Sequence, residues 1–163
     1  MLPELSALFE KLQRELDGVR ILVAAAPEGA LDRHGPGAGA DEGWSAREML
    51  AHLVTSEHGM LALARAIVSG HGDALPAAYD VHAENAKAVA TRRGLLAADL
   101  LREWGRGRAD WTAFLEALTP EQLEMSGRHP ASLQPMSLRT VVIVMLRHDR
   151  GHRAEMAALL KGG

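Results

Sequence analysis

Apolar residues recur at steps of three and four positions through most of this chain, which is the spacing of one face of an α-helix. The alternation of apolar and polar residues that marks a half-buried strand is nearly absent. Four long helices joined by loops predict an all-α protein, a four-helix bundle with one or two short extra helices. The long helices are expected over residues 3–25, 45–69, 95–118 and 137–161, with a further helical stretch over 78–92 and a short helix from Pro120.

Capping residues and glycines set the expected helix boundaries. Ser45 can cap the second long helix while Glu48, three residues on, reaches back to the backbone N–H of the cap. Gly105 and Gly107 each weaken the third long helix by about 1 kcal/mol, so we expect a bend there. The expected glycine- and proline-rich loops cover residues 27–43 and 127–135.

The composition favours a globular protein with one domain over residues 1–163, because 47% of its residues are hydrophobic. The net charge of −3 and a pI of about 6.2 argue against a dedicated nucleic-acid binder, which would usually carry a basic patch. Five arginines depart locally from this balance, and we expect them on solvated helix faces. They are Arg92, Arg93, Arg102, Arg106 and Arg108.

The chain has no cysteine, which excludes structural disulfides, cysteine-ligated zinc and a thiol nucleophile of its own. Any thiol chemistry would therefore need an external thiol. The N-terminus lacks a basic region followed by an apolar run, so no signal peptide is predicted. No stretch approaches the roughly 18 uninterrupted apolar residues of a transmembrane helix. We expect a soluble cytoplasmic protein that binds neither membrane nor nucleic acid.

Two histidines four residues apart, His148 and His152, stand in the last long helix. At about 100° per residue they fall in one stripe with apolar side chains, so they should face the core. A buried polar group without a partner costs about 1–3 kcal/mol. Neighbouring imidazoles on one helix face can hold a single metal ion, which would satisfy both rings. The apolar members of the stripe are Val141, Met145, Met156 and Leu159.

His52 is the strongest candidate for a third ligand, because it lies in the inward-facing stripe of the second long helix. His58 lies about 120° around that helix and should face elsewhere, and His82, near a helix start, is a weaker candidate. Three imidazoles from facing helices suit zinc, nickel, iron or copper better than calcium or magnesium. The remaining histidines stand in glycine- and proline-rich segments: His34, His71 and His129.

Each of these residues also has a structural interpretation. An inward-facing histidine is commonly a hydrogen-bonded core residue, and the His-x-x-x-His spacing also arises by chance. Glu48, one turn before His52, could contact the site or act as a base, but it also completes the capping box. Trp44 is expected to anchor the helix start in the core rather than to contact a substrate. Asp149 and its arginine neighbours flank the ligand pair but are expected to point away from its stripe.

Several motifs follow one another along nearly the whole chain. They are Trp44-Ser45-x-x-Glu48-x-x-x-His52-Leu53, the segments 79–85, 92–95, 127–130 and 136–139, and His148-x-x-x-His152. In this order they resemble the DinB/YfiT-like superfamily of metal-binding four-helix bundles. The resemblance implies that His52, His148 and His152 hold one divalent metal with water in the open positions. It also implies that Asn85 lies near a substrate pocket.

The resemblance further implies thiol chemistry, because family members with assigned activities use low-molecular-weight thiols. Those activities are bacillithiol or mycothiol transfer and thiol-dependent isomerisation, and some members are hydrolases. We expect one divalent metal, zinc or nickel with iron or manganese as alternatives, and transfer of a small thiol to an electrophile in detoxification or stress. No catalytic residue is predicted beyond the candidate Glu48.

Other functions and an assembly state stay open at this point. A metal-dependent hydrolase is the first alternative. A non-catalytic, stress-induced bundle that binds a small molecule around a structural metal is the second, and a purely helical interaction module is the third. A homodimer is a further expectation, because two-fold dimers are the commonest oligomers.

Overall fold

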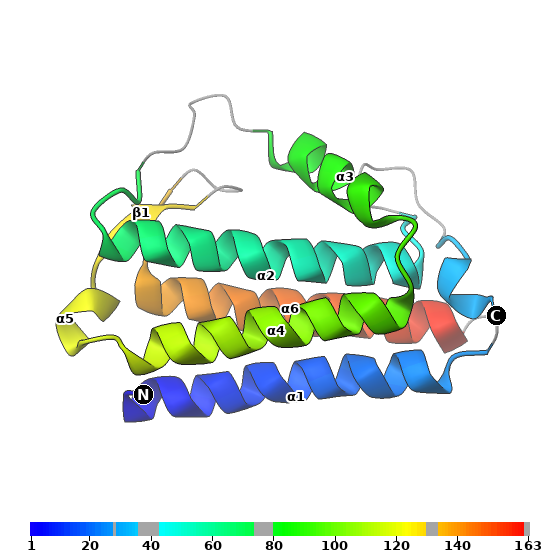
Figure 1. Cartoon of the computed structure of the whole chain (residues 1–163), viewed down its shortest axis with the longest axis horizontal. Coiled ribbons are helices and arrows are strands. Elements are labelled where there is room, and N and C mark those ends of the chain that lie inside the picture. Colours follow the sequence, from blue (N-terminus) through cyan, green and yellow to red (C-terminus); the bar gives the residue numbers. More distant parts are fainter. Residues whose placement is uncertain (28, 36–42, 74–79, 130–133, 162–163) are drawn as a thin grey trace.

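Four long helices lie side by side in the computed structural model and form the body of the protein (Figure 1). The structure describes residues 1–27, 29–35, 43–73, 80–129 and 134–161. The predicted all-α four-helix bundle is confirmed. Its long helices are α1 (Pro3–Ala25), α2 (Ala46–Val68), α4 (Ala97–Glu116) and α6 (Leu138–Lys161). The shorter elements are η1 (Ala30–Asp32), α3 (Val81–Arg92), α5 (Pro120–Leu123), β1 (Ser126–Arg128) and β2 (Pro135–Ser137).

Two clusters of buried apolar side chains fill the bundle, and each long helix contributes to both. Leu12 and Trp111 belong to the first cluster, while Leu16, Leu53 and Trp104 belong to the second. Each large apolar side chain that is fully buried contributes about 1.5–3 kcal/mol through the hydrophobic effect. None of the helices in the described part of the chain has both the length and the apolarity needed to span a membrane.

The start of α2 follows the predicted capping box. The Ser45 hydroxyl accepts a hydrogen bond from the backbone N–H of Glu48 at 3.2 Å, and the Ser45 N–H donates to Glu48 Oε2 at 3.0 Å. A cap of this kind stabilises a helix by about 1 kcal/mol. It also fixes the first residue of α2, which decides the direction of every side chain further along the helix, His52 included.

Two helices differ from their predicted form. α3 begins at Val81 rather than at residue 78, because the Asp80 carboxylate caps it by accepting hydrogen bonds from the backbone N–H groups of His82 and Ala83, each at 3.0 Å. α4 continues as one unbroken helix through Gly105 and Gly107, where we expected a bend. A Cβ atom at Gly107 would lie 2.8 Å from Glu57 Cγ, so close packing of α4 on α2 accounts for this glycine.

The predicted loop over 127–135 was wrong in part, because its described ends belong to a short antiparallel hairpin. β1 pairs with β2 so that Gly127 lies opposite Met136. The Arg128 N–H donates to the Gly72 carbonyl at 2.8 Å, which ties the hairpin to the turn that follows α2. Three-residue strands are too short to produce a recognisable alternation, so the apolar pattern could not reveal them. The predicted loop over 27–43 lies partly outside the described residues.

Candidate metal centre

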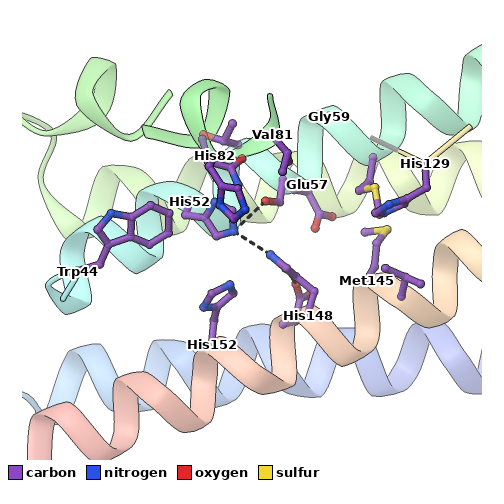
Figure 2. Close-up of a pocket in the computed structure, with 16 residues that line it drawn as sticks. Trp44, His52, Glu57, Gly59, Val81, His82, His129, Met145, His148 and His152 are labelled. Carbon is purple, nitrogen blue, oxygen red and sulfur yellow. Dashed lines mark hydrogen bonds and ion pairs between the residues drawn. The ribbon is translucent and has the colours of Figure 1, made fainter. Parts of the chain in front are cut away.

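The structure brings His52 of α2 together with His148 and His152 of α6 (Figure 2). The Nε2 atoms of His52 and His148 are 2.8 Å apart. The ring of His152 lies 4.9 Å from that of His52 and 4.6 Å from that of His148, measured between centroids. Each ring offers one nitrogen, and these three nitrogens lie within 4.8 Å of one another. Three side chains from two helices therefore converge on one point inside the bundle.

Burial keeps at least two of these rings neutral near pH 7. Burial of His52, with smaller effects from His148 and His152, lowers its pKa to about 3. Burial also lowers the pKa of His152, and the nearby Glu155 only partly offsets this. A neutral imidazole keeps a lone pair on one ring nitrogen, which is the form that binds a metal.

Each histidine ring on α6 has a carboxylate near its Nδ1 atom. His152 Nδ1 lies 2.8 Å from Glu155 Oε2, and His148 Nδ1 lies 3.5 Å from Asp149 Oδ1. In the tautomer in which Nδ1–H donates to the carboxylate, Nε2 is left as an acceptor. Metal-binding histidines characteristically have such a partner on the ring nitrogen that faces away from the metal. The donor set and its outer partners therefore fit a divalent cation.

A cavity of about 410 Å³ adjoins the three rings (Figure 2). Its lining is mostly apolar and includes Met60, Val81, Val144 and Met145. Trp44 also lines it, with its ring centroid 4.9 Å from that of His52, so this residue is both a core anchor and a wall of the cavity. Five of the eight histidines of the chain line the cavity: His52, His82, His129, His148 and His152.

A buried charged cluster underlies one wall of the cavity. The Arg108 guanidinium of α4 lies 2.7 Å from Asp149 Oδ2 and 3.0 Å from Glu57 Oε2. Trp104 Nε1–H donates to the same Glu57 oxygen at 3.1 Å. The expectation that Arg108 is solvated was wrong, since this side chain is 2% exposed. Asp149 is also buried, at 3% exposed. Both acidic residues of the cluster also line the cavity.

This cluster holds two carboxylates for one guanidinium, and the imbalance falls on Glu57. Burial raises the pKa of Glu57 to about 7, although Arg108 acts in the opposite direction. The negative charge of Asp149 adds to the rise. Glu57 therefore takes up a proton as the pH falls through about 7.

We expect Glu57→Gln to remove one part of the pH dependence of stability. The pKa of Glu57 is about 7 in the folded protein and 4.5 without the protein environment. The contribution of Glu57 to the free energy of unfolding therefore falls as the pH rises through that interval. Glutamine resembles the protonated form at every pH, so the variant should gain on the parent as the pH rises. Urea unfolding of both proteins between about pH 5 and about pH 8 measures the difference. A difference that stays constant with pH would contradict the expectation.

Of the other residues singled out in the sequence, one lines the cavity and two lie outside it. Asn85 lines the cavity from α3. Glu48 lies outside the cavity lining, in the capping box of α2, and its Oε1 is 3.2 Å from Arg93. It borders a separate small cavity of about 140 Å³. His58 is exposed, as its position on the helix predicts.

Sequence reasoning missed two groups of cavity residues. His129 follows β1 in the chain, and hairpin geometry rather than helical periodicity brings it to the cavity. Burial, together with His148, lowers its pKa. Asp149 and Glu57 were missed because charged residues next to a ligand stripe ordinarily face water. The burial of Asp149 and Glu57 could have been inferred only from their shared partner Arg108, whose own burial depends on how α4 packs in the bundle.

The fold and the site together define a class: four-helix bundles with a group of three histidines that could hold one divalent metal. Residues 8–156 match the sequence pattern of the DinB superfamily, so the chain belongs to this superfamily. Among solved structures, the chain is similar to YfiT from Bacillus subtilis, described as "a probable metal-dependent hydrolase with an unusual four-helix bundle topology". The match has a TM-score of 0.75 at 19% identity and covers 94% of this chain and 84% of YfiT. No curated protein sequence matches significantly.

Proposed function

We propose that this protein is a metal-dependent enzyme in which His52, His148 and His152 hold one divalent cation. The observation that supports this most directly is the convergence of three imidazoles at the wall of a cavity of about 410 Å³. A cation held there would lower the pKa of a bound thiol or water and so supply a nucleophile at neutral pH. Imidazole nitrogens suit zinc or nickel, with iron as an alternative, and we keep manganese as a second alternative.

The preferred reaction is transfer of a low-molecular-weight thiol to an electrophile, in a detoxifying or stress-related role. The thiol releases its proton to solvent, its sulfur bonds to an electrophilic carbon, and the bond from that carbon to the leaving group breaks, so that the leaving group departs with the bonding electrons. Among the described residues, the two carboxylates that line the cavity are both bound to Arg108. A thiol ionises near pH 8.5, far more readily than water, so a bound thiol needs a smaller lowering of its pKa than a bound water to become a nucleophile at neutral pH.

The cavity residues would bind and orient the two reactants. Met60, Val144 and Met145 form an apolar wall that can bury the carbon skeleton of an electrophile and exclude water around it. Asn85 offers an amide that can hydrogen-bond a polar group of either reactant. The thiol comes from outside the protein, because the chain contains no cysteine.

Hydrolysis is the second candidate function, and the description of YfiT favours it. The same three histidines would serve, with water in place of the thiol. The two candidates differ in one measurable property. Thiol transfer consumes thiol in proportion to product, whereas hydrolysis proceeds without any thiol.

The test is an activity screen on protein that has been stripped with a chelator and then reloaded. Zinc-, nickel-, iron- and manganese-loaded samples are offered bacillithiol, mycothiol or glutathione with an aryl halide electrophile, and separately a nitrophenyl ester without thiol. We expect the metal-loaded samples to form the thioether, and we expect the rate to fall by more than about 100-fold when the metal is stripped, because the cation lowers the pKa of the bound thiol. His58→Ala, which changes an exposed histidine of α2, should behave as the parent.

Three outcomes would change the proposal. Equal activity in the stripped and loaded samples would remove the metal from the reaction. Ester cleavage without thiol would assign the protein to the hydrolases. Tight metal binding without turnover of any substrate would favour a binding protein with a structural metal.

A further inference from the structure

The buried arginine of α4 occupies a position between the two helices that carry the three histidines. α4 contributes none of these histidines, yet Arg108 contacts a carboxylate on each helix that does. Its 2.7 Å contact is to Asp149 of α6, the residue after His148, and its 3.0 Å contact is to Glu57 of α2, five residues after His52. One side chain thus joins α2 to α6 beside the three rings.

Asp149 connects this arginine to one of the rings. Its Oδ2 lies 2.7 Å from the Arg108 guanidinium, while its Oδ1 lies 3.5 Å from His148 Nδ1. With one oxygen bound to a fixed guanidinium, the carboxylate has little freedom to turn. The direction of the other oxygen, and so the orientation of the His148 ring, depends on Arg108.

Glu57 is held just as closely on the other side of the arginine. Trp104 donates to its Oε2 through the indole N–H, and the Arg108 guanidinium carbon lies 5.7 Å from the centroid of the Trp104 ring. Close approach of the helices makes these contacts reachable, because Gly107 leaves no Cβ between α4 and the Glu57 side chain. Arg108 is therefore confined by both partners and by the indole.

Stability alone is a poor explanation for this cluster. Removing an arginine and two carboxylates from water has a large desolvation cost, and apolar replacements of such clusters often leave a protein as stable or more stable. Arg108 Nε and Nη1 are buried without hydrogen-bond partners in the described structure, so the cluster is not fully satisfied. A cluster that stabilises poorly but contacts both ligand-bearing helices is better explained by what it positions.

We propose that Arg108 is a positioning residue for the metal centre. Through Asp149 it fixes the ring of His148, and through Glu57 it sets the separation of α2 from α6, so it determines how tightly the three histidines bind a cation. The inference rests on the proposed metal site, and it adds α4 to the elements on which that site depends.

The test compares zinc affinity with folding stability in the full-length protein. Zn²⁺ affinity is measured by competition with a chromophoric chelator, and the thermal midpoint is measured on the metal-free protein. Arg108→Lys, which keeps the charge but loses the planar fork, and Asp149→Asn should each weaken Zn²⁺ binding by about 10- to 100-fold, the usual effect of losing an outer partner of a ligating histidine. The d–d spectrum of Co²⁺-loaded Arg108→Lys should also shift, since it reports ligand geometry.

Glu15→Gln is the matched control. Glu15 is a buried carboxylate of α1, 5% exposed, that pairs with α6 through Arg150 at 3.2 Å and Arg153 at 2.6 Å. Its replacement also removes a buried carboxylate that forms ion pairs with α6, through arginines that are partly exposed, but it touches none of the three histidines. It should lower the thermal midpoint and leave Zn²⁺ affinity within about twofold of the parent, because distant sites couple weakly.

If Arg108→Lys fails to fold, a triple variant that combines Arg108→Met, Glu57→Gln and Asp149→Asn takes its place in the test. It removes all three charges of the cluster and so leaves no buried charge unpaired. It should fold and still bind Zn²⁺ at least about 10-fold more weakly than the parent. Affinity equal to that of the parent in the folded variants would overturn the role of Arg108 and leave the metal site intact. Failure of the parent itself to bind Zn²⁺, Ni²⁺, Fe²⁺ or Mn²⁺ would overturn the proposed function and this inference together.

Discussion

His148→Ala is expected to empty the proposed metal site while the bundle stays folded. The substitution removes one of the three proposed ligands, and a site with two imidazoles lacks the three protein ligands that catalytic metal sites ordinarily have. We expect the affinity to fall by more than about 100-fold, beyond the effect of losing an outer partner. The ring is only partly buried, so its removal leaves a small cavity and little change in the free energy of unfolding.

Elemental analysis of protein purified without a histidine tag measures this effect, and circular dichroism reports the helices. His58→Ala is the control, because it removes an exposed imidazole from the same bundle. Equal metal content in His148→Ala and the parent would count against the three-histidine site. Loss of helical signal together with loss of metal would instead show that the ring is part of the core.

Trp104→Ala should destabilise the protein by about 3–5 kcal/mol, a large share of the total stability of an ordinary domain. The side chain is 0% exposed and lies in the second of the two clusters of buried apolar side chains. Its removal leaves a large cavity and also deprives Glu57 Oε2 of the indole hydrogen bond at 3.1 Å. The surrounding helices can close such a space only in part, so most of the lost packing is not recovered.

Urea unfolding with linear extrapolation measures the Trp104 effect. Trp104→Phe restores much of the volume without the N–H donor, so it should fall between the parent and the alanine variant. Ile21→Ala, at a side chain that is 69% exposed, should change stability by less than about 0.5 kcal/mol. A loss below about 1 kcal/mol in Trp104→Ala would mean that the bundle repacks around the gap, contrary to the close packing described here.

Helical periodicity predicted the features of the fold that depend on a single helix. The direction of His52 follows from the Ser45 cap and about 100° per residue, and so does the exposure of His58. The pairing of His148 with His152 also requires only one helix. Their meeting with His52 could be expected from inward-facing stripes on two helices, but the 2.8 Å approach of the rings depends on how far each helix is shifted along the bundle.

Features that arise between helices could not be predicted in this way. Arg108 stands in a helix rich in charged residues, and its burial depends on the acidic partners that α2 and α6 present to it. The arrival of His129 at the cavity depends on a hairpin too short to leave a pattern. Asp149 was expected only to point away from the histidine stripe, because its position on its own helix says nothing about a cation on α4.

The rings of His52 and His148 touch although the two residues are 96 positions apart in the chain. During synthesis the three-nitrogen group cannot form until the last helix has left the ribosome and docked, since the earlier part of the chain carries only one of its members. An incomplete polypeptide keeps at most scattered imidazoles, whose hold on a metal is weak. Capture of the ion would thus report that α6 has been synthesised and has docked, and free metal in excess should raise the free energy of unfolding with the logarithm of its concentration.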